Sequence, residues 1–205
     1  EASATPRSLH VVYINTSLET KAQAHHLVPT ITCTSSNVVK TILQAAAQIP
    51  DLHVWYGPDT YMGGNLRTMF TQFAGMTDAQ IQALHPAHDR GSILGLLERF
   101  HVFQEGACVV HHMFGGDVVD RVRSEHGDAY HTAHLEVPGE MFELAVAAAA
   151  EDRGVVGSTS NILGFISDKV EQRKADHGTL SFVLGTEAGM VTAIVKKVQQ
   201  QLVAA

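Results

Sequence analysis

The segment from Cys108 to Glu136 holds the densest group of side chains that can move protons or bind a metal. Cys108-Val-Val-His111 forms a short apolar run, and His134-Leu-Glu136 ends the next one. Side chains two apart in a strand share a face, so we expect His134 and Glu136 to point the same way. Parallel α/β sheets gather function at the carboxyl ends of their strands. The plainer interpretation is a core cysteine with incidental histidines, of which the chain has 13.

Two hydroxyl-rich clusters precede helical patterns, one at Thr34-Ser35-Ser36-Asn37 and one at Ser158-Thr159-Ser160-Asn161. A helix start offers backbone N–H donors and a positive dipole end, which suit a phosphate or a carboxylate. Ser35, Ser158 and Thr159 add hydroxyl donors, so they are candidate anion-binding residues. Ordinary helix capping is the alternative interpretation of both clusters.

An internal repeat connects these features. Tyr13-Ile14-Asn15 is followed by a helix, a strand and the first hydroxyl cluster, and His134-Leu135-Glu136 is followed by the same series. Tyr13 would be a hydrogen-bond donor or an acid, or else an aromatic residue at a strand end with its hydroxyl in water. The repeat predicts two similar domains, spanning residues 1–106 and 107–205.

Short apolar runs alternate with helical patterns along the chain. Strands are expected at 9–14, 30–33, 52–56, 107–110, 130–136, 155–156 and 180–184, and helices that include 92–100 and 116–126. This alternation predicts an α/β protein in which helices cover short parallel sheets.

Composition limits the classes of function. The 205 residues carry a net charge of −7, and no basic run is longer than Lys196-Lys197, which argues against nucleic acid as a partner. No apolar run approaches the ~20 residues of a membrane helix, and we expect no signal peptide. With only two cysteines, a disulfide framework is not expected, and a reducing compartment is.

Several motifs together resemble quinolinate synthases, most closely the plant-type branch. The matching segments, in family order, are Tyr13-Ile14-Asn15-Thr16-Ser17, Thr34-Ser35-Ser36-Asn37, Pro58-Asp59 with Met62-Gly63, Cys108-Val-Val-His111, His134-Leu-Glu136, Gly157-Ser158-Thr159-Ser160 and Thr186-Glu187-Ala-Gly189. The resemblance covers nearly the whole chain. It implies pseudo-symmetric, repeated three-layer α/β/α domains around a central active site.

The resemblance also implies a reaction. Quinolinate synthase is a transferase that condenses iminoaspartate with dihydroxyacetone phosphate to give quinolinate, a precursor of NAD. A 4Fe-4S cluster acts as its Lewis acid. By position in the motifs, Cys108 would be a cluster ligand, and Tyr13, His134 and Glu136 would be catalytic. Asn15, Ser35, Ser158 and Thr159 would bind substrate.

The chain matches only part of the pattern of cysteines and domains that the family has. Only Cys108 matches a cluster-ligand position, and the family's first domain has no counterpart here. We therefore expect a fragment made of the second and third domains, inactive alone and without an intact cluster. Its partners would be the missing first domain and, in a homodimer, a second copy. Its location would be the plastid in a photosynthetic eukaryote and the cytoplasm otherwise.

Two alternative functions remain open from the residues alone. One is a non-catalytic module that binds a phosphorylated metabolite at the two hydroxyl clusters. The other is a zinc-dependent hydrolase that uses His111, His134 and Glu136 with Cys108.

Overall fold

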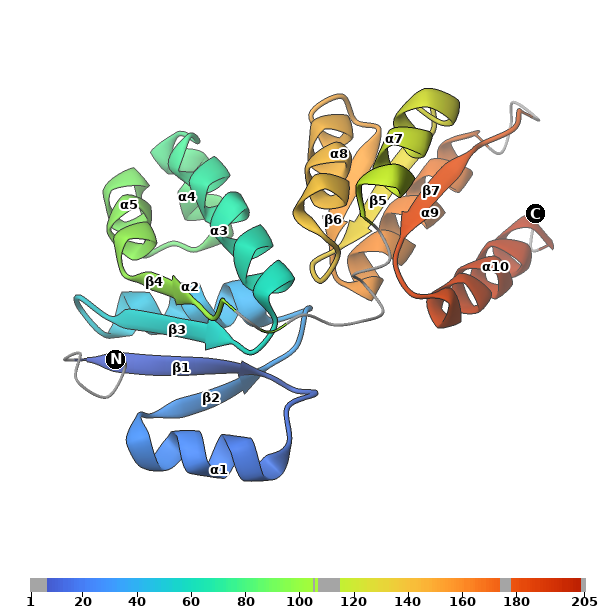
Figure 1. The fold of residues 1–205 in the computed structure, drawn as a ribbon. Helices are drawn as coiled ribbons and strands as arrows, with labels where there is room; N and C mark the ends of the chain where they lie inside the picture. The colour runs from blue at the N-terminus through green and yellow to red at the C-terminus, as the bar shows by residue number, and fades with distance from the viewer. Residues whose placement is uncertain (1–6, 105, 107–114, 174–177, 204–205) are drawn as a thin grey trace. The chain divides into compact units, whose positions relative to one another are not determined.

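The computed structural model describes residues 7–104, 106, 115–173 and 178–203. The chain divides into two compact units, Glu1–Ala107 and Cys108–Ala205, and each is considered by itself. Both are built from parallel strands and helices (Figure 1). No helix in the described ranges is long and apolar enough to cross a membrane.

The first unit carries one parallel sheet. Its elements are β1 (Ser8–Tyr13), α1 (Leu18–Leu27), β2 (Thr30–Cys33), α2 (Val38–Gln48), β3 (His53–Gly57), α3 (Thr60–Ala74), α4 (Asp78–Leu84), α5 (Arg90–Glu98) and β4 (Phe100–Val102). The strand order is β2-β1-β3-β4. Val11, Val54 and Tyr56 are fully buried, because helices cover the sheet with apolar residues such as Phe70 and Ile42.

The second unit has a shorter parallel sheet. Its elements are α7 (Gly116–Glu125), β5 (Tyr130–His134), α8 (Gly139–Ala149), β6 (Gly154–Gly157), α9 (Thr159–Arg173), β7 (Phe182–Gly185) and α10 (Ala188–Val203). The strand order is β6-β5-β7. Ile162, Ile166 and Ile194 form one apolar cluster on α9 and α10, and partly buried residues of β7 pack against it.

The two sheets repeat the same topology. In each unit the first strand is central, the second lies on one side and the third on the other. Right-handed crossovers that run in opposite directions place their helices on opposite faces of a sheet. The connecting helices α1 and α2, and likewise α8 and α9, therefore lie on opposite sides, which produces the three-layer α/β/α arrangement.

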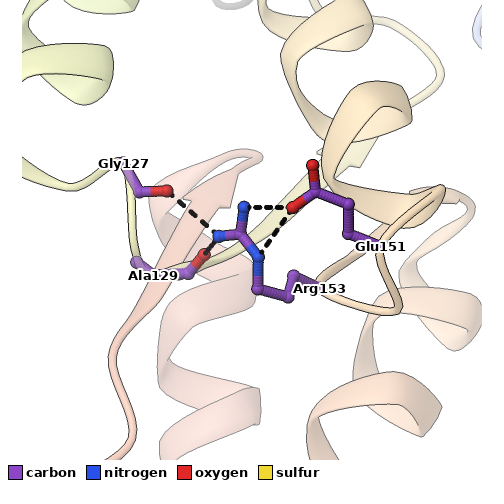
Figure 2. A network of polar contacts seen from close by, with 4 residues as sticks. All are labelled: Gly127, Ala129, Glu151 and Arg153. Carbon is purple, nitrogen blue, oxygen red and sulfur yellow. Dashed lines mark hydrogen bonds and ion pairs between the residues drawn. The ribbon is translucent and has the colours of Figure 1, made fainter.

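Arg153 ties together the amino ends of the second sheet (Figure 2). Its Nη1 donates to the carbonyls of Gly127 (3.0 Å) and Ala129 (3.4 Å), just before β5. Its Nε and Nη2 donate to Glu151 Oε2 at 3.2 and 2.7 Å. Because the guanidinium holds these carbonyls in a fixed fork, it sets how β5 enters the sheet beside β6.

The structure corrects two expectations from the sequence. Residues 100–102 form β4, although the expected helix was drawn through Phe100. The helix ends at Glu98 because β4 pairs with β3, from Val54 opposite Phe100 to Tyr56 opposite Val102. Strand β5 ends at His134 rather than at residue 136. The strand expected at 107–110 lies outside the described residues.

Candidate functional site

A tight turn follows the central strand of the first unit and carries Tyr13 and Asn15. Ile14 N donates to Cys33 O at 2.9 Å, and Thr16 N donates back to Tyr13 O at 3.0 Å. Lys21 Nζ donates to Ile14 O at 2.7 Å and so fixes the turn from α1. Tyr13 is half-buried and Asn15 is exposed. The turn therefore displays both side chains at the carboxyl end of β1.

The same turn follows the central strand of the second unit. Leu135 N donates to Gly157 O at 3.1 Å, and Val137 N donates back to His134 O at 3.2 Å. Tyr13 is paired with Cys33, the last residue of β2, and His134 is paired with Gly157, the last residue of β6. His134 is thus the counterpart of Tyr13, and Glu136 that of Asn15.

His134 and Glu136 form a buried pair. His134 Nδ1 lies 3.1 Å from Glu136 Oε2, and the two side chains are only 8% and 11% exposed. The shared strand face expected from the sequence is not the cause, because Glu136 lies beyond the end of β5 and the turn brings it back to His134. A carboxylate this close to Nδ1 can orient the imidazole ring, as a general acid–base pair requires.

The two hydroxyl clusters also have matching geometry. Asn37 Oδ1 accepts a hydrogen bond from Thr34 N at 2.8 Å, and Asn161 Oδ1 accepts one from Ser158 N at 3.0 Å. In both clusters the asparagine folds back by three residues to close the turn. The sequence analysis missed this role, although the asparagine occupies the fourth position of each cluster.

The hydroxyls of these clusters are used differently. Ser158 is buried, and its Oγ donates to Asn161 Oδ1 at 2.6 Å and accepts from Asn161 N at 3.4 Å, so it caps α9. Thr159 is exposed at the first position of α9, and Ser35 is half-buried in the turn before α2. Helix starts present backbone N–H groups without intrahelical partners, which suits an anion.

The order of the strands places both turns where α/β sheets commonly bind ligands. In open α/β sheets, ligands bind outside the carboxyl ends of strands where the winding direction reverses. That reversal occurs between β1 and β3 in the first unit and between β5 and β7 in the second. The turn at Tyr13 follows β1, and Asp59 follows β3 on the other side of the first reversal. Asp59 itself is a structural cap, since its Oδ1 accepts from Met62 N at 2.6 Å.

The described residues do not assemble a metal site. They contain no group of three or more His, Cys, Asp or Glu side chains that could hold an ion. Cys33 is 1% exposed, and burial raises the pKa of its thiol to about 12, with an opposing effect from a backbone hydrogen bond. Cys33 is therefore a packed core thiol rather than a thiolate ligand. Cys108 and His111 lie outside the described residues.

His131 is a buried titratable residue that the sequence analysis did not single out. Its side chain is 3% exposed, and its Nδ1 has no hydrogen-bond partner among the described residues. Burial lowers the pKa of His131 below its ordinary value, against a smaller raising effect of the Gly127 carbonyl. The folded chain therefore disfavours the protonated ring.

We expect His131 to make the protein less stable in acid. The unfolded chain binds the proton more readily, so the free energy of unfolding should fall as pH drops through about 6.5 toward the lower folded-state pKa. Urea unfolding from pH 8 to pH 5 should show a shallower pH slope in His131→Gln than in the parent chain. His126→Gln, at an exposed position, is the control. An equal slope in His131→Gln and the parent would contradict the assignment.

Comparisons with known proteins identify the family of the chain. Residues 2–205 match the family model described as quinolinate synthetase A protein. The chain is 62% identical over 204 residues to a chloroplastic quinolinate synthase of Nicotiana tabacum and 61% identical to that of Arabidopsis thaliana. Each match covers 98% of this chain and 28% of the relative.

A more distant relative matches over a similar part of the chain. The quinolinate synthase of Prosthecochloris aestuarii is 26% identical over 193 residues, which cover 94% of this chain and 44% of that protein. The chain thus spans less than a third of its plant relatives and less than half of this bacterial one. Because the family model matches almost every residue, the chain belongs to the quinolinate synthetase A family.

Proposed function

We propose that this chain is the second and third α/β/α domains, residues 1–106 and 107–205, of a longer quinolinate synthase. That protein would condense iminoaspartate with dihydroxyacetone phosphate to quinolinate in NAD biosynthesis. The observation that carries the proposal is the buried His134–Glu136 pair on a turn that repeats the Tyr13–Asn15 turn. Membership of the family supplies the reaction.

Each side chain of the candidate site would have a different role, set by its chemistry. His134, oriented by Glu136, would take and return a proton. Tyr13 would donate a hydrogen bond or a proton from its place at the end of β1. Asn15 lacks a charge, so it would hold an intermediate through amide hydrogen bonds.

The hydroxyl clusters would bind the anionic groups of the substrates. Iminoaspartate carries carboxylates, and dihydroxyacetone phosphate carries a phosphate. Ser35 and Thr159 would donate hydroxyl hydrogen bonds beside the starts of α2 and α9. Ser158 would act indirectly, by holding the turn before α9, because its backbone N–H and its Oγ both already bond to Asn161 Oδ1.

The family implies an iron–sulfur cluster, and the donors of this chain are too few to hold one. Three thiolates are needed, whereas the chain has two cysteines and Cys33 is buried and protonated. We propose that Cys108 supplies one ligand and that the other thiolates come from elsewhere in the longer protein. No chemical step is assigned to the cluster.

The cysteines provide the test of this assignment. In the longer protein, reconstituted anaerobically, Cys108→Ser should lose the bound iron and sulfide together with quinolinate formation, because a serine oxygen is a poor replacement for a thiolate. Cys33→Ser is the matched control and should keep the full iron content. The 205-residue chain alone should hold no intact cluster. Four irons retained in Cys108→Ser would refute the ligand assignment.

The plant relatives are named chloroplastic, and we propose a plastid location for this protein. A homodimer of the longer protein remains a proposal. The zinc hydrolase alternative has the His134–Glu136 pair among the described residues, and its other two ligands, Cys108 and His111, lie outside them. The alternative of a phosphate-binding module makes a different prediction from the enzyme: the protein would bind phosphate and form no quinolinate.

A further inference from the structure

The two turns that carry the candidate site residues are anchored differently. Each has the same pair of backbone hydrogen bonds, one to the neighbouring strand and one back to the residue at the strand end. In the second unit, Leu135 and Val137 are 1% and 0% exposed, so the apolar core holds the turn on β5. Their counterparts in the first unit are Ile14, which is 49% exposed, and Thr16, which is half-buried. The core therefore contributes less to the first turn.

The side chain of Thr16 does not replace this packing. Its Oγ1 is shielded from water and has no hydrogen-bond partner among the described residues. A hydroxyl buried in this way weakens the folded turn, because the hydrogen bonds that it made to water in the unfolded chain are lost. The first turn therefore needs an anchor from outside the turn itself.

Lys21 supplies that anchor. Its Nζ donates to Ile14 O at 2.7 Å, the short distance of a hydrogen bond that carries a charge. Ile14 O belongs to the peptide group that joins Ile14 to Asn15. Because a peptide group is planar, a hold on its oxygen fixes how the backbone runs from Tyr13 to Asn15.

The start of α1 places the ammonium of Lys21. Ser17 caps the helix: its Oγ accepts from Thr20 N at 3.1 Å, and its carbonyl accepts from Lys21 N at 3.1 Å. Because Ser17 directly follows Thr16 in the chain, the cap also ties the beginning of α1 to the turn at Tyr13. Lys21 is half-buried there, and the lower local dielectric strengthens its hydrogen bond to the turn.

The second unit has a core residue where the first has this lysine. Helices α1 and α8 both begin five residues after the last residue of the central strand, and their fourth residues are Lys21 and Phe142. Phe142 is 0% exposed, so at this position one repeat has a buried ring and the other has an ammonium on the carbonyl of the turn. Because α1 buries none of its residues, Lys21 acts on the turn rather than on the core of its unit.

We propose that Lys21 is a positioning residue for quinolinate formation, a role that rests on the function proposed above. It would act through Ile14 O, without touching the reacting atoms. Its hydrogen bond would hold Tyr13 and Asn15 in the directions that proton donation and the binding of an intermediate require. Both actions follow substrate binding, so loss of Lys21 should lower kcat and leave KM nearly unchanged.

Amide hydrogen exchange in the 205-residue chain tests the anchor itself. Lys21→Met removes the ammonium and keeps an unbranched stem. The Thr16 amide, which donates to Tyr13 O within the turn, should then exchange at least about tenfold faster. The Val137 amide, at the same position in the second turn, should keep its rate. The melting temperature should stay nearly the same, because α1 buries no residue.

Steady-state kinetics of the longer protein test the role in the reaction. Lys21→Met should lower kcat for quinolinate formation by about 10–10²-fold, the loss expected from small displacements of reacting groups, with KM for both substrates nearly unchanged. Lys21→Arg keeps the charge and the N–H donors, so it should recover most of the kcat. Lys196→Met is the matched control, since Lys196 is exposed on α10 in the other unit, and its kinetics should match those of the parent.

Three results would overturn the proposal. One is an unchanged Thr16 exchange rate in Lys21→Met, because the lysine would then not anchor the turn. Another is the kcat of the parent in Lys21→Met. The third is a fall of several degrees in melting temperature, which would make the lysine a stabiliser of the fold. In each of these cases the parent protein still forms quinolinate, whereas a parent that forms none would refute the proposed function, so the two failures are distinguishable.

Discussion

Replacing Glu136 by Gln in the longer protein should lower kcat/KM for quinolinate formation by about 10²–10⁴-fold, the usual contribution of a positioned acid–base group. Gln keeps the size of the side chain and can still accept from His134 Nδ1. It removes the negative charge that lies 3.1 Å from His134 Nδ1. The measurement is steady-state quinolinate formation across a pH series, which should show a lower rate throughout the series.

Glu140→Gln is the matched control for this prediction. Glu140 is exposed in the first turn of α8, so its substitution removes the same charge a few residues away without touching the pair. Its activity and pH profile should match those of the parent protein. Full activity in Glu136→Gln, or an equal loss in both variants, would remove Glu136 from the proposed acid–base pair.

Replacing Gly157 by Ala should destabilise the second unit by about 1–3 kcal/mol through backbone strain alone. Gly157 has φ of 155°, which L-residues with a side chain rarely adopt, and an added Cβ would lie 2.7 Å from Asn161 Oδ1. Moving Asn161 would also weaken the Ser158 cap, which contributes a further ~0.5–2 kcal/mol. Urea unfolding of the chain, followed by circular dichroism, measures the change.

Gly164→Ala distinguishes this effect from a general intolerance of the helix. Gly164 lies in the middle of α9 with no atom within 4 Å of an added Cβ. Ala is favoured over Gly in a helix interior by roughly 0.5–1 kcal/mol, so this variant should be as stable as the parent or more so. If Gly157→Ala were as stable as Gly164→Ala, the turn before α9 would not depend on glycine.

Much of the fold was predictable because it follows from local spacing. Apolar runs such as Val11-Val12 and caps such as Ser17, whose Oγ accepts from Thr20 N, depend on residues a few positions apart. The repeat of Tyr13 and His134 before the two hydroxyl clusters was visible for the same reason. The polar turns at the ends of the strands were also visible from local sequence.

Other features depended on segments far apart in the chain. The helix expected through Phe100 ends at Glu98 because Phe100 meets Val54, a partner that no local window contains. In the sequence, Cys33 lies on an apolar strand just before a helix start, which favours core packing, with a reactive thiol as the alternative. Its burial under distant side chains raised its pKa to about 12 and decided the question.

The candidate site shows the same division. Residue types and order singled out Tyr13, His134 and Glu136, because a polar residue at a strand end is a local pattern, and the family resemblance added Asn15. Only the tertiary structure showed that a turn, not strand alternation, joins His134 to Glu136. The turn forms because Leu135 N bonds to Gly157 O on a neighbouring strand, a pairing that depends on how the sheet assembles.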